Sequence, residues 1–331
     1  MRNRLTLIAL LVLLPVVSFA QQGLPFIDSA RSNCVRGDWK PAIKWLKVGV
    51  KAGSKECMTA LGDYYSCQER YKKAAKYYTM ANNAEGDYGL GCLYLRGNLG
   101  CQSVLDMQRG LRWVRSAEQA GYRDAIFLLA CMFDEGGLLE QSYDSAVVML
   151  RRLPTDPYAL FLLAGYYERG TGVRRDSLQA MEYYRRSGEA GLSDGYAIVG
   201  DYYRCGLAGM APDSLLAYQN YMLAAGISDD NARGLFGVAD CYLKGIGTRV
   251  DSAKAVYFLR DAVVAGSSRA AAELADIYYY GRAGIETNAD TAQMLYQMAR
   301  QTNLRKDVCK WQKALYEKKD RWDTIKRKKE R

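Results

Sequence analysis

The sequence contains no histidine among its 331 residues, and only six prolines. The lack of histidine excludes Ser-His-Asp and Cys-His nucleophile arrangements and histidine general bases. It also argues against a structural zinc site, because no Cys-x-x-Cys pair occurs either. The Ser-x-x-Lys and Gly-x-x-x-x-Gly-Lys-Ser/Thr motifs of penicillin-recognising enzymes and P-loops are likewise missing. The sequence therefore predicts no catalytic residues, no bound metal and no cofactor.

Long runs of β-branched residues, which strands favour, are absent, and an internal repeat is present instead. Aspartates recur every 32 to 39 residues, at Asp106, Asp144, Asp176, Asp213, Asp251 and Asp290. A glycine follows most of these aspartates at a nearly constant distance, for example 15 residues after Asp176 and Asp251. A period in the thirties with two apolar helical stripes per unit predicts an α-solenoid, so we expect an all-α fold.

Each unit of the repeat has the signals of two helices joined by a turn. We expect the aspartate to cap the second helix and the glycine to end it. The turns between the helices are predicted at Gly170-Thr-Gly172 and Gly245-Ile-Gly247. Small residues follow apolar ones in the first helix, which lets a neighbouring helix approach closely, at Leu61-Gly62, Val199-Gly200, Val238-Ala239 and Leu274-Ala275.

The clearest copy of the repeat runs from Leu163 to Tyr184. It reads Leu-Ala-Gly-Tyr-Tyr-Glu-Arg-Gly-Thr-Gly-Val-Arg-Arg-Asp-Ser-Leu-Gln-Ala-Met-Glu-Tyr-Tyr and is closed by Ala190-Gly191. This pattern resembles the Sel1-like repeat family, a subclass of tetratricopeptide-like helical hairpins. The resemblance covers about residues 33–301 and is weakest over 87–156. It implies a right-handed superhelix of about seven helix-turn-helix repeats, used for protein–protein interaction and without catalysis in most members.

The N-terminus has the features of a signal peptide: a basic start at Met1-Arg-Asn-Arg4, an apolar run over 5–17, and Ser18-Phe-Ala20 as a cleavage site. The apolar run is shorter than the roughly 18–20 residues of a spanning helix. We therefore expect an exported protein, periplasmic or secreted after cleavage near Ala20. The predicted segments are a signal peptide (1–20), an N-terminal capping segment with a half repeat (21–54), Sel1-like repeats (55–301), and a basic C-terminal capping helix and tail (302–331).

The nine cysteines are an odd number, so at least one is unpaired within a monomer. An oxidising compartment favours pairing among the seven before residue 206, whereas the other interpretation makes several of them small buried apolar residues. The cysteines do not recur at two fixed positions per repeat, so no disulfide pattern is transferred from the family.

The net charge of +10 is concentrated at the ends of the chain. Residues 305–331 hold twelve Lys or Arg and five Asp or Glu, and the first four residues add two Arg. The repeats are therefore nearly neutral, which predicts no nucleic-acid partner. In the tail, an apolar stripe at helical spacing consists of Val308, Trp311, Leu315, Trp322 and Ile325. It indicates a capping helix over 305–322; the alternative is a basic amphipathic helix that binds an anionic membrane surface.

The resemblance to tetratricopeptide hairpins places peptide contacts on the first helices, which line the concave surface. The first exposed position follows the Leu-Gly pair, at Asp63, Cys92, Cys131, Gly165, Asp201, Asp240 and Asp276. The last one lies four residues later, at Cys67, Arg96, Glu135, Arg169, Cys205, Lys244 and Tyr280. From these rows we predict a binding site for a peptide that carries both charges, formed by Asp63, Arg169, Asp201, Asp240, Lys244, Asp276 and Tyr280.

The predicted function is that of an exported, non-catalytic scaffold or adaptor that binds a protein or peptide on the concave face. Two alternatives stay open at this point. One is a cell-envelope enzyme, which would show a convergent polar cluster in a deep pocket. The other is peripheral membrane attachment through the basic tail. For any single residue of the two rows, the alternative to binding is an ordinary solvated helix face.

Overall fold

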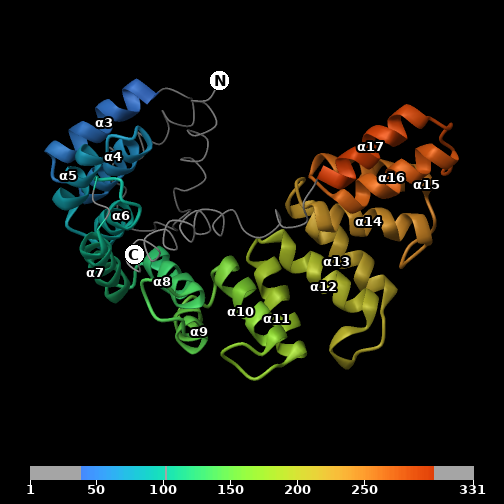
Figure 1. The fold of residues 1–331 in the computed structure, drawn as a ribbon, viewed down its shortest axis with the longest axis horizontal. Helices are drawn as coiled ribbons and strands as arrows, with labels where there is room; N and C mark the ends of the chain where they lie inside the picture. The colour runs from blue at the N-terminus through green and yellow to red at the C-terminus, as the bar shows by residue number, and fades with distance from the viewer. Residues whose placement is uncertain (1–38, 101–102, 302–331) are drawn as a thin grey trace, which may run out of the picture. The chain divides into compact units, whose positions relative to one another are not determined.

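The structure is a computed structural model, and it describes residues 39–100 and 103–301. Within these ranges the chain forms fifteen α-helices and no strand, as the sequence predicts (Figure 1). The predicted signal peptide, the predicted C-terminal capping helix and the tail lie outside the described residues. The chain divides into two compact units, Met1–Met132 with Leu138–Glu140, and Phe133–Gly137 with Gln141–Arg331.

The first unit contains one helix followed by successive helical hairpins. Its helices are α3 (Trp39–Lys51), α4 (Lys55–Cys67), α5 (Tyr71–Ala81), α6 (Ala84–Leu95), α7 (Val104–Gln119) and most of α8 (Arg123–Glu135). The pairs α4–α5 and α6–α7 are the hairpins, and α5 packs against α6. The α4–α5 connection is only three residues long, Gln68–Arg70, where the other hairpins have a longer loop.

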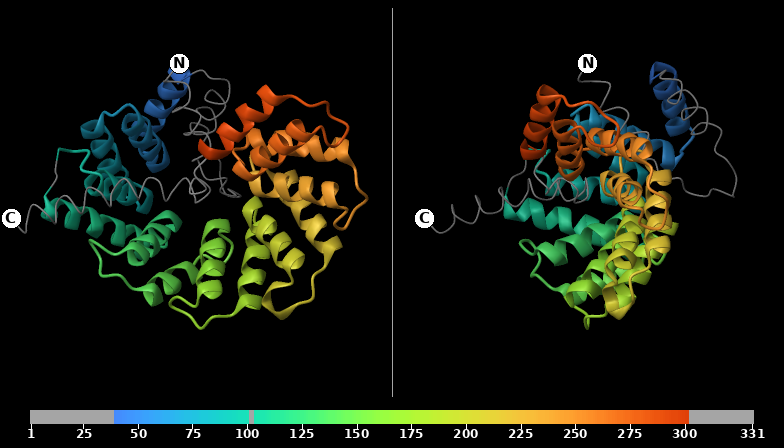
Figure 2. Two further views of the ribbon diagram at one scale, coloured as in Figure 1. Left: turned by 45° about the vertical axis from the view of Figure 1, so that its right-hand side comes forward. Right: turned by 90° about the vertical axis from the view of Figure 1, so that its right-hand side faces the viewer.

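The second unit continues with hairpins of the same kind. Its helices are α9 (Tyr143–Arg151), α10 (Pro157–Arg169), α11 (Ser177–Glu189), α12 (Ser193–Cys205), α13 (Ser214–Ile227), α14 (Ala232–Lys244), α15 (Ser252–Val264), α16 (Ser268–Tyr280) and α17 (Ala289–Gln301). A single 3-10 turn, η1 (Leu207–Gly209), lies in the α12–α13 loop. In the hairpins α10–α11, α12–α13 and α14–α15, the second helix packs on its own partner and on the first helix of the next hairpin (Figures 1 and 2).

Aspartates begin three of the second helices in the predicted way. The side chains of Asp176, Asp213 and Asp251 each accept a hydrogen bond from the backbone N–H three residues on. These caps satisfy donors that the first turn of a helix leaves without an intrahelical partner.

The predicted caps at Asp106, Asp144 and Asp290 are wrong. Ser103 and Ser142 are the N-caps of α7 and α9, and Asn288 caps α17 through the N–H of Thr291. The capping residue therefore lies two or three residues before the aspartate. A carboxylate in the first turn is still favourable, because it faces the positive end of the helix dipole.

Most of the predicted closing glycines do adopt the left-handed conformation that ends a helix. Their φ angles are +85° at Gly53, +78° at Gly121, +100° at Gly191 and +94° at Gly266. Gly226 is an exception, because α13 continues through it to Ile227 and ends at Ser228 in extended backbone. The length of the repeat unit therefore varies because α13 ends differently from the other second helices, and also because the loops differ in length.

Tyrosines of the second helices fill the space above the small residues of the first helices. A Cβ added to Gly62 would lie 2.4 Å from Cε1 of Tyr78, and one added to Gly200 would lie 2.7 Å from the ring of Tyr221. The glycines are thus retained for packing, as the sequence predicts, since glycine inside a helix costs about 1 kcal/mol relative to alanine. The result is a core that runs between the two helices of each hairpin.

None of the helices in the described ranges combines the length and the hydrophobicity needed to cross a bilayer. Cys57 and Cys241 carry free thiols and are buried, as the interpretation of cysteines as small apolar residues expects, and burial raises the pKa of both. Cys67 and Cys205 carry free thiols that are exposed.

Candidate functional site

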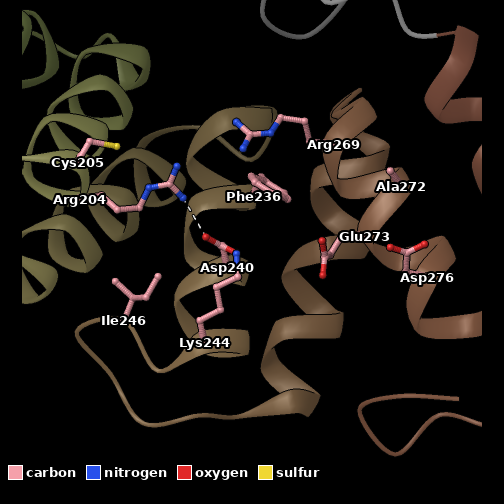
Figure 3. Close-up of a pocket in the computed structure, with 10 residues that line it drawn as sticks. All are labelled: Arg204, Cys205, Phe236, Asp240, Lys244, Ile246, Arg269, Ala272, Glu273 and Asp276. Carbon is pink, nitrogen blue, oxygen red and sulfur yellow. Dashed lines mark hydrogen bonds and ion pairs between the residues drawn. The ribbon is translucent and has the colours of Figure 1, made fainter. Parts of the chain in front are cut away.

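A cavity of about 590 Å³ opens on the first helices of the last three hairpins in the second unit (Figure 3). We call it the α14 groove. It is lined by Arg204, Cys205, Phe236, Asp240, Lys244, Ile246, Arg269, Ala272, Glu273 and Asp276. Its volume lies within the range of ligand pockets, roughly 300–1,000 Å³.

Helical periodicity explains why these residues meet. Phe236, Asp240 and Lys244 follow one another at steps of four on α14. On α16 the lining residues Arg269, Ala272, Glu273 and Asp276 are spaced by three, one and three residues. Both patterns describe a single face of a helix. The groove is therefore formed where one face of α14 lies beside one face of α16, with the end of α12 at its edge.

Asp240 is the most buried charged group in the α14 groove, with 4% of the residue exposed. Its Oδ2 accepts a hydrogen bond of 2.9 Å from Nη1 of Arg204, and its Oδ1 lies 2.5 Å from Nζ of Lys244. A buried carboxylate requires such partners, because an unpaired charge in this position would be costly. Arg204 comes from the preceding hairpin, so this contact also ties α12 to α14.

The other aspartates of the predicted row accept hydrogen bonds from tyrosines of their own hairpins. Tyr78 donates to Asp63 at 2.7 Å and Tyr221 donates to Asp201 at 2.5 Å. Asp276 accepts from Tyr296, which raises the pKa of Tyr296 to about 12. These three aspartates are half-buried, and not the freely exposed groups expected from the family pattern. They hold the two helices of a hairpin together.

One sequence position distinguishes Asp240 from these aspartates. The donating tyrosine is the eighth residue after the N-cap of the second helix in α5, α13 and α17, and Tyr184 on α11 occupies the same position. In α15 this position is Leu259, which is fully buried. Asp240 thus has no tyrosine to bind, and it is paired with two cations instead.

The remaining predicted residues lie outside the α14 groove. Asp63 belongs to the first unit, and Asp201 is 3.8 Å from Nε of Arg233. The guanidinium of Arg169 lies over Gly165, where other hairpins have an aspartate, and 5.7 Å from the ring centroid of Tyr166. Tyr280 is 58% exposed, and Arg282 lies 4.7 Å over its ring. A binding role for these four residues stays a prediction.

The structure brings together Asp240, Lys244 and Asp276 of the predicted set, and adds residues that the sequence did not indicate. Phe236 lies one turn before Asp240, and Glu273 and Arg269 lie one and two turns before Asp276. They could have been predicted by continuing the spacing of three or four residues along the same helix face toward the N-terminus. Neighbouring first helices are close enough that their earlier turns share one surface.

In the part of the chain that the structure describes, no group of three or more His, Cys, Asp or Glu side chains is arranged to hold a metal ion. The α14 groove offers paired and unpaired charges, one aromatic ring and aliphatic side chains. Such a surface suits recognition of a peptide by ion pairs and apolar contacts.

Known proteins resemble this chain over most of its described length. A crystal structure of a Sel1 repeat protein from Oxalobacter formigenes has a TM-score of 0.66 and 27% identity, and the match covers 74% of this chain and all of that one. A protective antigen of uropathogenic Escherichia coli strains, with an SLR fold, has a TM-score of 0.47 and 23% identity over 85% of this chain and 68% of its own.

A curated protein of Neisseria meningitidis serogroup B, described as uncharacterized, is 25% identical over 280 residues. The match covers 74% of this chain and 58% of that protein, so this chain spans little more than half of the relative's length.

The Sel1 repeat profile matches residues 84–122, 123–152, 157–192, 232–263 and 268–301. These stretches cover the helices α6 and α7, α8 and α9, α10 and α11, α14 and α15, and α16 and α17. The hairpin α12–α13 falls between matched stretches, and it packs on α11 before it and on α14 after it. Because the matched stretches make up more than half of the sequence, the chain belongs to the Sel1 repeat family.

Proposed function

We propose that this protein is an exported, non-catalytic adaptor that captures a partner protein by a peptide segment lying in the α14 groove. Sel1 repeat solenoids typically serve as scaffolds for protein interaction and are in general non-catalytic. The observation that carries the proposal for this chain is the groove itself. It is open, and its charged side chains come from three successive hairpins.

The arrangement of the groove favours a peptide over a small molecule. Its lining is spread along faces of two helices and does not converge on one buried polar point. The carboxylate of Asp240 is paired with Arg204 and Lys244, so it forms part of the wall of the groove. Glu273 and Arg269, in contrast, form no ion pair with any residue in the described ranges.

Site-specific crosslinking tests this proposal directly. A photo-reactive amino acid placed at Ala272, which lines the groove, should give a covalent adduct with one partner in the cells that produce the protein. The same amino acid at Leu178 on α11, which is 55% exposed and outside the groove, serves as the control. The same adducts from both positions, or none from Ala272, would contradict the proposal.

Export is proposed from the signal-peptide pattern over residues 1–20. Cell fractionation of the full-length chain, followed by N-terminal sequencing, should place the protein outside the cytoplasm with Gln21 as its first residue. Recovery of the intact chain from the cytoplasm would contradict this part of the proposal and leave peptide capture untouched.

A further inference from the structure

The α16 face of the groove carries two opposite charges, one helical turn apart, that do not pair with each other. Arg269 and Glu273 are four residues apart, a spacing at which opposite charges on a helix usually interact. Neither forms an ion pair or a side-chain hydrogen bond with a described residue. The guanidinium of Arg269 instead lies 4.9 Å over the ring centroid of Phe236 on α14.

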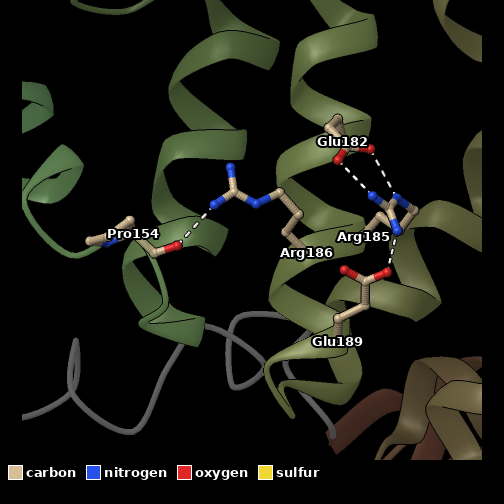
Figure 4. A network of polar contacts seen from close by, with 5 residues as sticks. All are labelled: Pro154, Glu182, Arg185, Arg186 and Glu189. Atoms are coloured by element: carbon tan, nitrogen blue, oxygen red, sulfur yellow. Dashed lines mark hydrogen bonds and ion pairs between the residues drawn. The ribbon is translucent and has the colours of Figure 1, made fainter.

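The same spacing and order do give a pair elsewhere in this protein. On α11, Arg185 donates to Glu189, four residues on, and also to Glu182 at 2.6 Å (Figure 4). The separation of Arg269 from Glu273 is therefore not imposed by helix geometry. Arg269 contacts Phe236 instead of Glu273.

A comparison with the preceding hairpin explains why Arg269 has no carboxylate. Arg233 occupies the same position on α14, seven residues before the row aspartate, and its Nε lies 3.8 Å from Oδ2 of Asp201 in the hairpin before. The equivalent acceptor for Arg269 is Asp240. Both oxygens of Asp240 are already occupied, so Arg269 is left without an anionic partner.

The occupation of Asp240 follows from one substitution in the repeat pattern. Leu259 stands where α5, α11, α13 and α17 have a tyrosine, and the carboxylate of Asp240 pairs with Arg204 and Lys244 instead. These two cations neutralise it and leave a net positive charge on this side of the groove.

The negative side of the groove lies on α16. Glu273 has no counterpart in the preceding first helices, where the equivalent residues are Gly237 on α14 and Ile198 on α12. Asp276, one turn further on, accepts one hydrogen bond, from Tyr296. The groove therefore presents a cation and an anion, one helical turn apart, that form no ion pair with any other described residue (Figure 3).

The spacing of Arg269 and Glu273 along α16 suits an extended peptide. Four residues of α-helix rise by about 6 Å. Residues i and i+2 of an extended strand, whose side chains point to the same side, are about 6.6 Å apart. An acidic and a basic side chain separated by one residue can therefore meet Arg269 and Glu273 at the same time.

We propose that the α14 groove recognises an extended peptide segment with an acidic and a basic residue at positions i and i+2. The acidic side chain pairs with Arg269, and the basic one pairs with Glu273, with Asp276 adding to the negative field. This assignment rests on the proposed function, because it specifies the ligand of the same groove. Unlike surface ion pairs exposed to water, pairs formed beside Phe236 are partly shielded from solvent.

The probe for this inference is a random peptide library of about twelve residues, displayed on phage and selected on the immobilised chain from Gln21 to Arg331. We expect the selected peptides to share opposite charges two residues apart. Opposite charges enriched only at i and i+4 would contradict the extended conformation.

Charge exchange then tests the named residues. In the double variant Arg269→Glu with Glu273→Arg, a selected peptide should bind at least ten-fold more weakly, as measured by fluorescence anisotropy. The same peptide with its acidic and basic residues exchanged should recover binding to that variant. The matched control is Arg185→Glu with Glu189→Arg, which exchanges a pair of the same spacing on α11 and should leave affinity unchanged.

The outcomes separate this inference from the proposed function. Selected peptides that compete with crosslinking from Ala272, but bind the Arg269→Glu/Glu273→Arg variant as tightly as the parent chain, would refute the charge assignment and leave peptide capture standing. A library that yields no binder above background would count against both. The single variant Glu273→Gln, which removes one charge without reversing it, should show an intermediate loss if the double variant fails to fold.

Discussion

Tyrosine–carboxylate hydrogen bonds are the recurring polar contact inside the hairpins. Within the hairpin α10–α11, Tyr184 donates to Glu168 at 2.9 Å, and Glu168 replaces the aspartate missing at Gly165. Tyr202 of the following hairpin donates to the same carboxylate at 3.1 Å. The carboxylate that accepts from the tyrosine can therefore lie one helical turn further along the first helix while the hydrogen bond is kept. Burial and the neighbouring carboxylate raise the pKa of Tyr184, so the tyrosine stays protonated as a donor.

Removal of one of these hydroxyls should destabilise the fold. Tyr221 is 1% exposed, and its hydroxyl is the hydrogen-bond donor to Asp201. We expect Tyr221→Phe to lower the free energy of unfolding by about 1–3 kcal/mol, because the half-buried carboxylate of Asp201 loses its hydrogen-bond donor. Tyr279→Phe, at a residue that is 55% exposed, is the control and should have little effect in urea unfolding followed by circular dichroism. Equal effects of both changes would argue against a structural role for the hydroxyl.

Asp63 makes stability depend on pH. Burial raises the pKa of its carboxyl to about 7, although the hydrogen bond from Tyr78 acts in the opposite direction and lowers the pKa. Since the unfolded chain has the lower pKa, about 3.9, the stabilising contribution is full below pH 4 and is lost as the pH rises to 7. The expected slope over this window is up to about 1.4 kcal/mol per pH unit.

The variant Asp63→Asn should reduce this slope, because the amide oxygen can still accept from Tyr78 and no charge forms there. Glu85, whose pKa is also raised by burial, keeps its own contribution. Urea unfolding at several values between pH 4 and 7.5 would show it. Glu140→Gln, at an exposed residue, is the control. A variant that loses stability between pH 4 and 7 as steeply as the parent chain would contradict the role of Asp63.

At the scale of helices and loops, the second glycine of the Gly-x-Gly turns connects one hairpin to the preceding one. Gly247 has a φ of +65°, and a Cβ there would lie 2.0 Å from the carbonyl oxygen of Ser214 at the start of α13. Gly172 is placed in the same way against Tyr143 of α9. These loops pack against the first turn of the second helix in the preceding hairpin.

The variant Gly247→Ala should therefore be more harmful than a glycine change at a helix end. Gly266 also has a positive φ, +94°, but a Cβ there would meet nothing within 4 Å. We expect Gly266→Ala to cost about 1–2 kcal/mol from the left-handed backbone alone. Gly247→Ala should cost clearly more, because the loop or α13 must shift as well. Similar thermal midpoints for the two variants would show that the contact with Ser214 is unimportant.

The elements were predictable from the sequence to differing degrees. Periodicity and the Gly-x-Gly turns located the hairpins, because those signals are local. The caps at Ser103, Ser142 and Asn288 were missed, because an aspartate two or three residues later fits the same pattern. The choice between two adjacent capping residues depends on which one the chain path brings over the first turn, and the repeat pattern alone does not contain that information.

The groove was predicted only in part for a related reason. Asp240, Lys244 and Asp276 were placed correctly on the first helices, but Arg269 and Glu273 were not considered. Their role depends on the distance between α14 and α16 and on the replacement of a tyrosine by Leu259 in another helix. A count along one helix cannot show which charges of its neighbour are already paired.

At the scale of the whole molecule, the first helix of the last described hairpin, α16, has an aromatic side chain that the described residues leave exposed. On the preceding first helix, Leu243 is partly buried and packs in a core shared with the following hairpin. Tyr279, at the equivalent position of α16, is 55% exposed. The capping helix predicted over 305–322 lies outside the described residues, and its role in covering this side chain stays a prediction.

Deletion of residues 302–331 should therefore lower the thermal midpoint of unfolding by several degrees, because a solenoid loses stability when its terminal apolar face is exposed. Deletion of 326–331 alone, the predicted tail, is the control and should change little. Circular dichroism at 222 nm is the measurement. An unchanged midpoint after the longer deletion would contradict the capping prediction.

The most direct test of the account is the reactivity of two exposed thiols in the presence of a peptide captured by the chain. Cys205 lines the α14 groove, whereas Cys67 lies in the first unit. The rate of maleimide labelling at each thiol can be followed by mass spectrometry. The account predicts that the peptide slows labelling of Cys205 several-fold and leaves Cys67 unchanged. Unprotected Cys205 in a saturated complex would contradict it.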